Sequence, residues 1–531
     1  MQCANQNLFA MTPSAFSLSR FCLPALAGCG VLAFSPWAQA ASWLQEDQLT
    51  LRPQASQAVQ VLGQARAEGL NPADYSAAAL QKAVQQAASQ PLGADQAASL
   101  DARLHQAVQR YLTDLHNGRV DPRTLKENYK DDHRKDFDAS VVLNQALDNG
   151  DLGQAWKAAT PSFPAYASLR KALHQLQALS GHAAWNSQLP ALPKSGRIAA
   201  GQEWAGLPVV AQRLAALGDM AAVPAGTPAT LTPALREGLK AFQARHSLSA
   251  NGLLDRKTVD ALNIKPEARA EQVALAMERA RWTPLAQGKR MIVVNVPQFR
   301  LYGYEIDQGK VIPKVSMRVI VGKSLDTRTP MFDEDMTYVE FSPYWNVPIS
   351  IARSETIPRI KRDPGYMARQ GFEIVQGNSV SSSPSAANLN AVLNGSARIR
   401  QKPGPRNALG DVKFMFPNNM NIYLHHTPST GLFNRDKRDL SHGCVRVEEP
   451  VQLAQFVLQD DPSWTKERIS KAMGGSKPTI ARLKEPLPVV LTYSTTVVLD
   501  GKPHYFADLY GHDKLLAQQL AKRSPATVSS K

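Results

Sequence analysis

The chain has 531 residues, 44% hydrophobic and 20% charged, with 32 glycines and 36 prolines. This composition is that of a globular protein and excludes collagen-like, coiled-coil and disordered classes, while the length predicts about three domains. Lys and Arg exceed Asp and Glu by 15, but they are spread among the acids and form no zinc finger or dense basic tract. Nucleic acid is therefore not a predicted partner.

The first forty residues have the pattern of an export signal. They contain one charged residue, Arg20, then an apolar run over 21–34, then Ala38-Gln39-Ala40. This order predicts a cleavable signal peptide over residues 1–40, and the run is shorter than the roughly 20 residues of a bilayer span. We therefore expect an exported protein. The alternatives are an uncleaved segment that tethers the chain to a membrane, and lipidation at Cys29.

Cysteine usage separates the leader from the rest of the chain. Three of the four cysteines, Cys3, Cys22 and Cys29, lie in the predicted leader, and the fourth is Cys444. Cleavage would leave Cys444 as the sole thiol. This excludes a disulfide-stapled scaffold and a multi-cysteine zinc site in the body of the protein.

Residues 41–202 are rich in Ala, Gln and Leu, and apolar residues recur there at helical spacing. The clearest helix is predicted over 101–116, where Leu104, Val108, Leu112 and Leu115 share one face. Weaker patterns predict helices over 56–67, 77–88 and 165–179. We expect an all-α scaffold domain that carries no catalytic constellation.

Residues 203–265 form a second helical segment, which contains FQARHSLSANGLLDRKTVDALN. This segment resembles the small three-helix peptidoglycan-binding domain, whose pattern is FQ, an NG or DG turn, then T and AL. Most of the matching positions are core or turn residues. A spacer with this fold and no affinity for sugar is the alternative interpretation.

From residue 289 onward the chain is β-rich, with short β-branched or aromatic runs bounded by Pro, Gly or Asn. Strands are predicted over 291–296, 299–304, 315–321, 337–344, 412–416 and 421–425, and a late hairpin over 488–498 and 504–509. The pattern predicts a β-sandwich or irregular barrel over 289–515, a lid insertion at about 350–410, and a C-terminal tail over 516–531.

The sole mature thiol lies in a polar loop, Ser441-His442-Gly443-Cys444-Val445-Arg446. Two histidines, His425 and His426, end a predicted strand 19 and 18 residues earlier, and a cysteine nucleophile needs such a base within reach. An inert buried thiol is the first alternative, but the polar flanks disfavour it. Zinc is the second; adjacent histidines on a strand point to opposite faces, and no C-x-x-C or H-E-x-x-H motif accompanies them.

These residues resemble the murein L,D-transpeptidases with a YkuD-type catalytic domain, of the large multi-domain Gram-negative type. The family pattern is a strand ending in His, a gap, then S/T-H-G-C-x-N/R. Resemblance extends through SMRVIVGKSLDTRTP, YWNVPISIA, RDPGYMARQGFE, PGPRNALGDVKFMFPN, YLHHTPSTGLF and RYLTDLHNGRVDPRTL. It implies a multi-domain α+β protein. Two departures are His426, where the family leads us to expect an acid, and the unmatched stretch 378–396.

The resemblance assigns roles residue by residue. Cys444 is the nucleophile and His425 its base, while Ser441, His442 and Gly443 form the loop that orders the site. The backbone N–H groups of Gly443 and Cys444 are the expected oxyanion donors. Tyr423 is expected to line the donor site, and Arg446 to orient His442 or a substrate carboxylate. No metal or cofactor is implied.

The implied reaction is 3→3 cross-linking of peptidoglycan in the periplasm. Cys444 would attack a tetrapeptide donor stem, expel its terminal D-alanine, and pass the acyl group to diaminopimelate on an acceptor stem. Alternatives are an L,D-carboxypeptidase that uses water, attachment of a lipoprotein to the wall, and a non-catalytic wall-binding protein. Carbapenems are the expected inhibitors.

Overall fold

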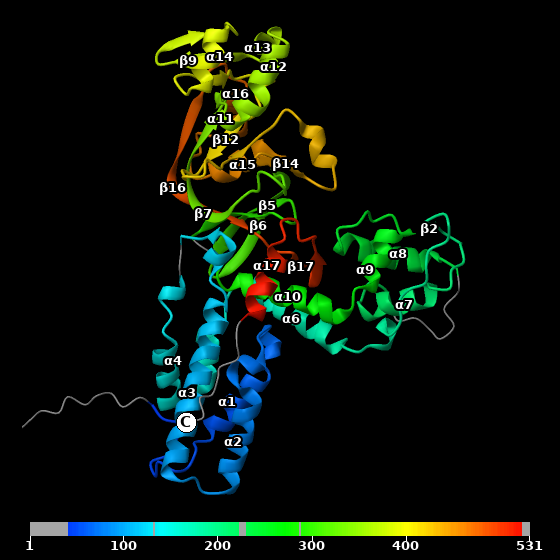
Figure 1. The fold of residues 1–531 in the computed structure, drawn as a ribbon, viewed down its shortest axis with the longest axis vertical. Helices are drawn as coiled ribbons and strands as arrows, with labels where there is room; N and C mark the ends of the chain where they lie inside the picture. The colour runs from blue at the N-terminus through cyan, green and yellow to red at the C-terminus, as the bar shows by residue number, and fades with distance from the viewer. Residues whose placement is uncertain (1–40, 131–132, 222–229, 286–287, 523–531) are drawn as a thin grey trace, which may run out of the picture. The chain divides into compact units, whose positions relative to one another are not determined.

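The computed structural model describes residues 41–130, 133–221, 230–285 and 288–522. The predicted signal peptide, residues 1–40, lies outside them, as does the end of the predicted tail, 523–531. Helices come first and strands second along the chain (Figure 1), which confirms the expected α+β order. Within the described ranges, no helix is both long and apolar enough to cross a bilayer.

The N-terminal helices form around one apolar core. They are α1 (Gln54–Gly63), α2 (Ala77–Ser89), α3 (Ala94–Asn117), α4 (Ala139–Asp148) and α5 (Leu152–Ala159). The apolar face predicted for 101–116 is buried in this core, and the helix is α3, which begins about two turns earlier than predicted. It ends at Gly118, whose φ of 76° is open to glycine without strain.

A sixth helix, α6 (Pro164–Ala178), packs against α10 (Pro266–Ala280) in a separate cluster. The end of α10 carries Arg279, which is 2% exposed and pairs with Glu127 and Asp513. Glu127 lies on the short strand β1 (Glu127–Asn128), which pairs with a barrel strand. This buried ionic cluster therefore joins the helical region to the β-rich region.

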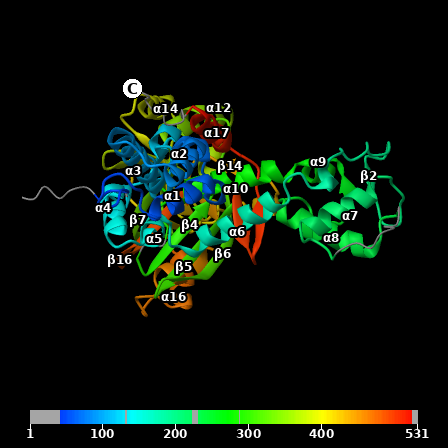
Figure 2. The same ribbon diagram turned by 90° about the horizontal axis from the view of Figure 1, so that it is seen from below.

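Three helices follow the predicted order of the second helical segment: α7 (Leu207–Ala216), α8 (Pro233–Arg245) and α9 (Arg256–Asn263), side by side in Figures 1 and 2. Gln243 of the FQ pair is 1% exposed, and its amide bonds Leu253 and Thr258. The motif residues thus hold the fold together. The core also contains Leu189 and Ile198, so this cluster begins before residue 203.

The β-rich region contains one large mixed sheet. Its strands are β1, described above, and β4 (Arg290–Asn295), β5 (Arg300–Asp307), β6 (Lys310–Gly322), β7 (Met331–Phe341), β12 (Val412–Met415), β13 (Leu424–His425), β14 (Asp439–Ser441), β15 (Val445–Val447) and β16 (Thr479–Thr492). Strand β16 pairs with β4 on one side and β7 on the other. The sheet therefore closes on itself as a barrel, which is the second of the two architectures predicted for this region, and does not form the two layers of a sandwich.

A register break in β16 accompanies this closure. Between Arg482 and Leu487 the pairing with β7 shifts, which bends a 14-residue strand enough to serve both neighbours. The predicted late hairpin is shorter than expected: β17 (Thr496–Leu499) pairs with β18 (Lys502–Tyr505) across Asp500-Gly501. The predicted tail begins inside helix α17 (His512–Ala521), because Leu516 is fully buried.

The segment predicted as a lid is a folded unit with its own core. It contains β8 (Trp345–Asn346), α11 (Ile349–Ile351), a π-helical turn (Ala352–Thr356), α12 (Ile357–Arg362), α13 (Gly365–Arg369), β9 (Phe372–Gln376), β10 (Ser379–Ser381), α14 (Ala386–Leu393) and β11 (Arg398–Gln401). The unmatched stretch 378–396 supplies β10 and α14. We call residues 345–401 the inserted unit.

Candidate active site

Two neighbouring strands place four of the predicted residues on one face of the barrel. β13 and β15 run parallel, with Leu424 opposite Val445 and His425 opposite Arg446. Since side chains alternate along a strand, Tyr423, His425, Cys444 and Arg446 share one face. Leu424 and Val445 point the other way into the core, and both are fully buried. The alternation of apolar and polar residues thus determines which face of the sheet presents Cys444 and His425 to the cleft.

The loop before Cys444 is held by internal hydrogen bonds. Ser441 Oγ accepts from the Gly443 N–H at 3.2 Å and donates to the Cys444 carbonyl. Gly443 has φ of 115°, a conformation that side chains disfavour, and its carbonyl accepts from Thr329 at 2.7 Å. Ser441 therefore holds the loop in shape with two hydrogen bonds, and we call this side chain the clamp of the loop. The predicted use of the Gly443 N–H for an oxyanion would require its bond to Ser441 to open.

Cys444 is half-buried, and it is the sole cysteine among the residues that the structure describes. Its sulfur lies 3.5 Å from the Asn421 carbonyl, to which the thiol donates. Burial raises the pKa of Cys444 above its usual value, while contacts with Tyr423 and the charge of Arg446 oppose that shift. The thiol is therefore protonated in the resting site and needs a base to activate it.

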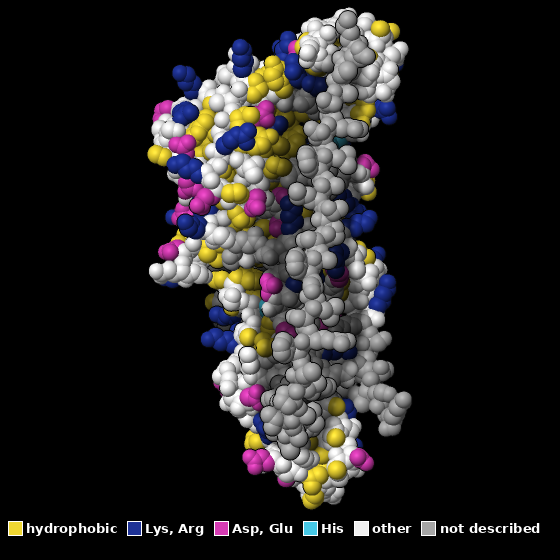
Figure 3. Space-filling model, turned by 90° about the vertical axis from the view of Figure 1, so that its left-hand side faces the viewer, with side chains coloured by type: hydrophobic (Ala, Val, Ile, Leu, Met, Phe, Trp, Pro, Cys, Tyr) yellow, Lys and Arg dark blue, Asp and Glu magenta, His cyan; other side chains and the backbone are white. Residues whose placement is uncertain are grey.

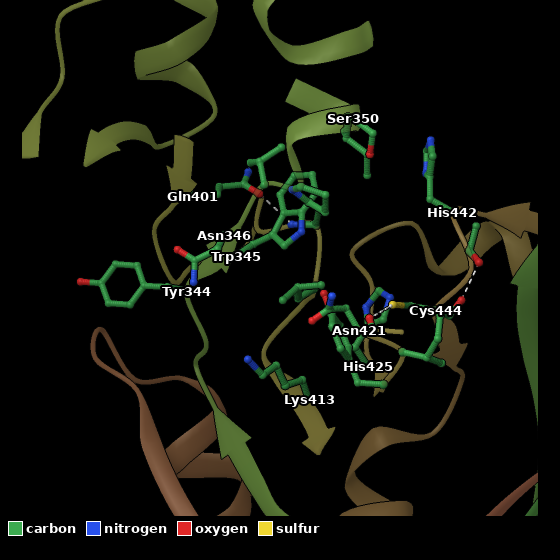
Figure 4. A pocket seen from close by; sticks show the side chains of 18 of the residues that line it. Tyr344, Trp345, Asn346, Ser350, Gln401, Lys413, Asn421, His425, His442 and Cys444 are labelled. Atoms are coloured by element: carbon green, nitrogen blue, oxygen red, sulfur yellow. Dashed lines mark hydrogen bonds between the residues drawn. The ribbon is translucent and has the colours of Figure 1, made fainter. Parts of the chain in front are cut away.

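His425 is 4% exposed and held in one tautomer. Its Nδ1 lies 2.5 Å from the carbonyl of His426, so Nδ1 must carry the proton and Nε2 is left as a base. Burial lowers the pKa of His425 to about 3, and the positive charge of Arg446 acts in the same direction. In Figure 4 the imidazole lies beside the Cys444 sulfur. The pair is thus a neutral imidazole next to a protonated thiol.

Arg446 lies where the strand register places it, across from His425. Its Nε is buried without a hydrogen-bond partner, and burial lowers its pKa. The charge of Arg446 acts on Cys444 and His425, and its predicted role toward His442 or a substrate carboxylate stays a prediction. Tyr423 contacts His425 edge to face at 5.8 Å, and burial raises its pKa.

His442 turns away from the thiol toward the inserted unit. Its Nε2 lies 2.7 Å from Glu355 Oε1, on the π-helical turn. The two side chains are 35% and 33% exposed. His442 therefore connects the cysteine loop to the inserted unit, and it is not a second base for Cys444.

These residues line a cleft of about 1020 Å³. Figure 4 shows Cys444, His425 and Asn421 on one side, with Trp345, Asn346 and Ser350 of the inserted unit across from them. Cationic side chains also line it: Arg359, Arg406, Lys413 and Arg446. The cleft can therefore take an extended ligand that carries carboxylates. Elsewhere, on the face in Figure 3, Lys and Arg are interspersed with acids.

Sequence reasoning missed four residues that shape the site: Asn421, Thr329, Glu355 and Asp411. Asn421 has φ of 56°, a turn geometry that Asn tolerates, and the preceding PNNMN run was the available signal. No sequence signal pointed to Glu355, because it lies 87 residues from its partner His442. Among the described residues, no group of three or more His, Cys, Asp or Glu is arranged to hold a metal ion.

Loss of the clamp should destabilise the loop and misplace the sulfur. Replacing Ser441 with alanine removes both loop bonds and leaves a buried Gly443 N–H unsatisfied, so the free energy of unfolding should fall by about 1–3 kcal/mol. Misplacement of the sulfur should also slow acylation of Cys444 by about tenfold or more. Chemical denaturation and intact-mass kinetics with a thiol-acylating reagent measure the two effects. Ser379→Ala, an exposed serine of β10, is the control, and equal behaviour of the two variants would refute the clamp.

Comparisons with known proteins find similar sequences. Residues 289–469 match the family described as the YkuD L,D-transpeptidase catalytic domain, and residues 38–173 match a family described as a scaffold domain. A Haemophilus influenzae protein named "Putative L,D-transpeptidase" is 35% identical over 274 residues. That match covers 50% of this chain and 54% of the relative, so the chain spans about half the length of the relative that it matches.

Two solved structures were also found at low similarity. A fused Zn-dependent amidase/peptidase/peptidoglycan-binding domain protein of Clostridium acetobutylicum is 11% identical, covering 56% of this chain and 99% of its own, with a TM-score of 0.17. A Bdellovibrio bacteriovorus protein is 12% identical, covering 45% and 58%, with the same TM-score. These scores carry no argument about the fold, so the family assignment rests on the sequence matches.

Proposed function

We propose that this chain, whose residues 289–469 belong to the YkuD L,D-transpeptidase catalytic domain family, forms 3→3 cross-links in peptidoglycan through a thioester on Cys444. The observation that supports the proposal most is the pairing of β13 with β15, which brings a base and a thiol to one face of a large cleft. The cationic lining supports a substrate with several carboxylates.

In the first half-reaction, His425 Nε2 takes the thiol proton and the sulfur attacks the carbonyl of the third residue of a tetrapeptide stem. The carbon–nitrogen bond to D-alanine breaks, and protonated His425 gives its proton to the leaving amine. In the second, the side-chain amine of diaminopimelate on an acceptor stem attacks the thioester. His425 takes the amine's proton, the carbon–sulfur bond breaks, and the thiol is restored.

The neutral resting pair fits this sequence of proton transfers. A protonated thiol reacts slowly with other electrophiles. When a bound peptide stem excludes water from the cleft, the sulfur would pass its proton to His425 Nε2 and the reaction would begin. We also propose that the predicted leader directs the chain to the periplasm, where its substrate lies. An uncleaved leader would instead tether the chain to the membrane.

Product analysis tests the proposal. The purified protein is incubated with tetrapeptide-stem muropeptides, and products are separated and weighed by mass spectrometry. We expect dimers joined 3→3 together with free D-alanine. Tripeptide monomers alone would identify an L,D-carboxypeptidase and overturn the cross-linking proposal.

A carbapenem supplies the companion measurement. We expect a mass increase of one inhibitor molecule, located to the peptide that contains Cys444. Absence of both this adduct and any muropeptide product would overturn the catalytic proposal and favour a wall-binding role.

A further inference from the structure

The carbonyl that orients His425 belongs to His426, and the side chain of His426 is itself held. His426 Nδ1 lies 2.7 Å from Asp411 Oδ1. Asp411 immediately precedes β12, which pairs with β13, and the His426 N–H donates to the Val412 carbonyl at 3.0 Å. The peptide and the ring of His426 are thus both attached to one neighbouring segment.

Gly410 brings that segment unusually close. It has φ of 66°, and a Cβ there would lie 2.8 Å from both Cβ and Nδ1 of His426. Only glycine lets the backbone approach in this way. Residues 410 and 411 therefore hold His426 from one side.

The segment that contains Gly410 and Asp411 is itself held in place by hydrogen bonds. The Ser342 N–H donates to the Asp411 carbonyl at 2.7 Å, and Gly410 donates to the carbonyl of Asn407 at 2.9 Å. Asn407 is 1% exposed, and its amide bonds the carbonyls of Pro343 and Lys402. Asp411 is consequently a fixed point against which the His426 ring can be held.

We infer that Asp411 and His426 act as a positioning pair for the proposed reaction: Asp411 fixes His426, and the carbonyl of His426 fixes His425 in the Nδ1–H tautomer. The inference rests on the proposed function for its kinetic consequences. The acid that we expected at position 426 is thus supplied from position 411, one strand away. The pair touches neither Cys444 nor the substrate position, and it acts through His425.

Substitutions of Asp411 distinguish a role in positioning His425 from a role in the stability of the fold. Asp411→Ala removes the acceptor and should lower kcat for dimer formation by about tenfold or more with KM little changed, because the base is misplaced while the cleft is intact. Asp411→Asn retains an acceptor oxygen and should recover most of kcat. The matched control is Glu485→Ala, which removes an exposed carboxylate from β16 and should change neither quantity.

A double substitution tests whether the two side chains act as a unit. If they do, Asp411→Ala with His426→Ala should lose no more kcat than the worse single variant. Independent, multiplying losses would overturn the pair. A wild-type kcat in folded Asp411→Ala, or an Asp411→Asn variant as slow as Asp411→Ala, would also overturn it.

A spectroscopic readout does not depend on the reaction. Proton–nitrogen NMR of the ¹⁵N-histidine-labelled protein should show a His425 Nδ1–H signal protected from exchange, assigned by its loss in His425→Gln. We expect that signal to exchange faster in Asp411→Ala and to be retained in Asp411→Asn. An unchanged signal in Asp411→Ala overturns the inference. If the wild type makes no dimers yet this pattern holds, the proposed function fails and the positioning pair stands.

Discussion

Replacing Cys444 with alanine should reduce 3→3 dimer formation by at least about 10⁴-fold, the largest effect that we expect of a single substitution, because Cys444 carries the sole thiol among the residues that the structure describes. The thiol is half-buried, and the alanine keeps the strand register of β15, so the free energy of unfolding should change little. The measurement is product analysis with purified muropeptides, together with a thermal unfolding curve for each protein.

Two control variants show whether the loss of dimer formation comes from the thiol itself. Cys444→Ser keeps the shape of the side chain but has a much weaker nucleophile, so it should be nearly as inactive while it unfolds like the wild type. His442→Gln removes the nearest other titratable group of the loop and should still yield the carbapenem adduct on Cys444. Undiminished dimer formation by Cys444→Ala would show that the reaction does not pass through this thiol.

Replacing His425 with glutamine should slow acylation of Cys444 by about 10²–10⁴-fold, the usual contribution of a positioned base. In the wild type, the pH dependence should be displaced to the acid side. A base works only when unprotonated, and burial lowers the pKa of His425 to about 3. The rate of carbapenem acylation should therefore show no acidic fall near pH 6.5, the usual pKa of histidine, and should hold down to about pH 4.

The charge of Arg446 supplies a matched test of this shift. Because Arg446 helps to lower the pKa of His425, Arg446→Met should move the acidic fall toward higher pH. The folded fraction must be followed at each pH. Between pH 6.5 and about 3 the unfolded chain binds a proton at His425 that the folded chain excludes, so the free energy of unfolding falls as pH falls. A wild-type fall centred near pH 6.5 would contradict the buried neutral base.

Several elements could be predicted from local sequence. The long helix α3 follows from its apolar spacing, and strands β4 to β7 follow from β-branched runs. The structure places His425 beside Cys444, while the side chain of His426 bonds Asp411. Each of these features depends on residues close together in the chain, where periodicity is informative.

The remaining features depend on contacts between distant residues. The group that orients His425 is a backbone carbonyl, and a carbonyl has no signature in a sequence. Glu355 meets His442 only because the inserted unit folds back over the cysteine loop. The choice between a sandwich and a barrel depends on one strand with a register break, β16, which pairs on both edges and closes the barrel. None of these is visible in the spacing of apolar residues.

The closing strand has a consequence for when the site is assembled. Strand β16 covers residues 479–492 and lies beyond the matched catalytic domain, which ends at residue 469. It is made 35 residues or more after Cys444, yet it completes the hydrogen-bonded ring to which β13 and β15 belong. Pairing across such separations is slow. The growing chain therefore passes through a stage in which Cys444 and His425 have been made but the ring of strands around them is still open, and the ring can close only after residues 479–492 have been synthesised.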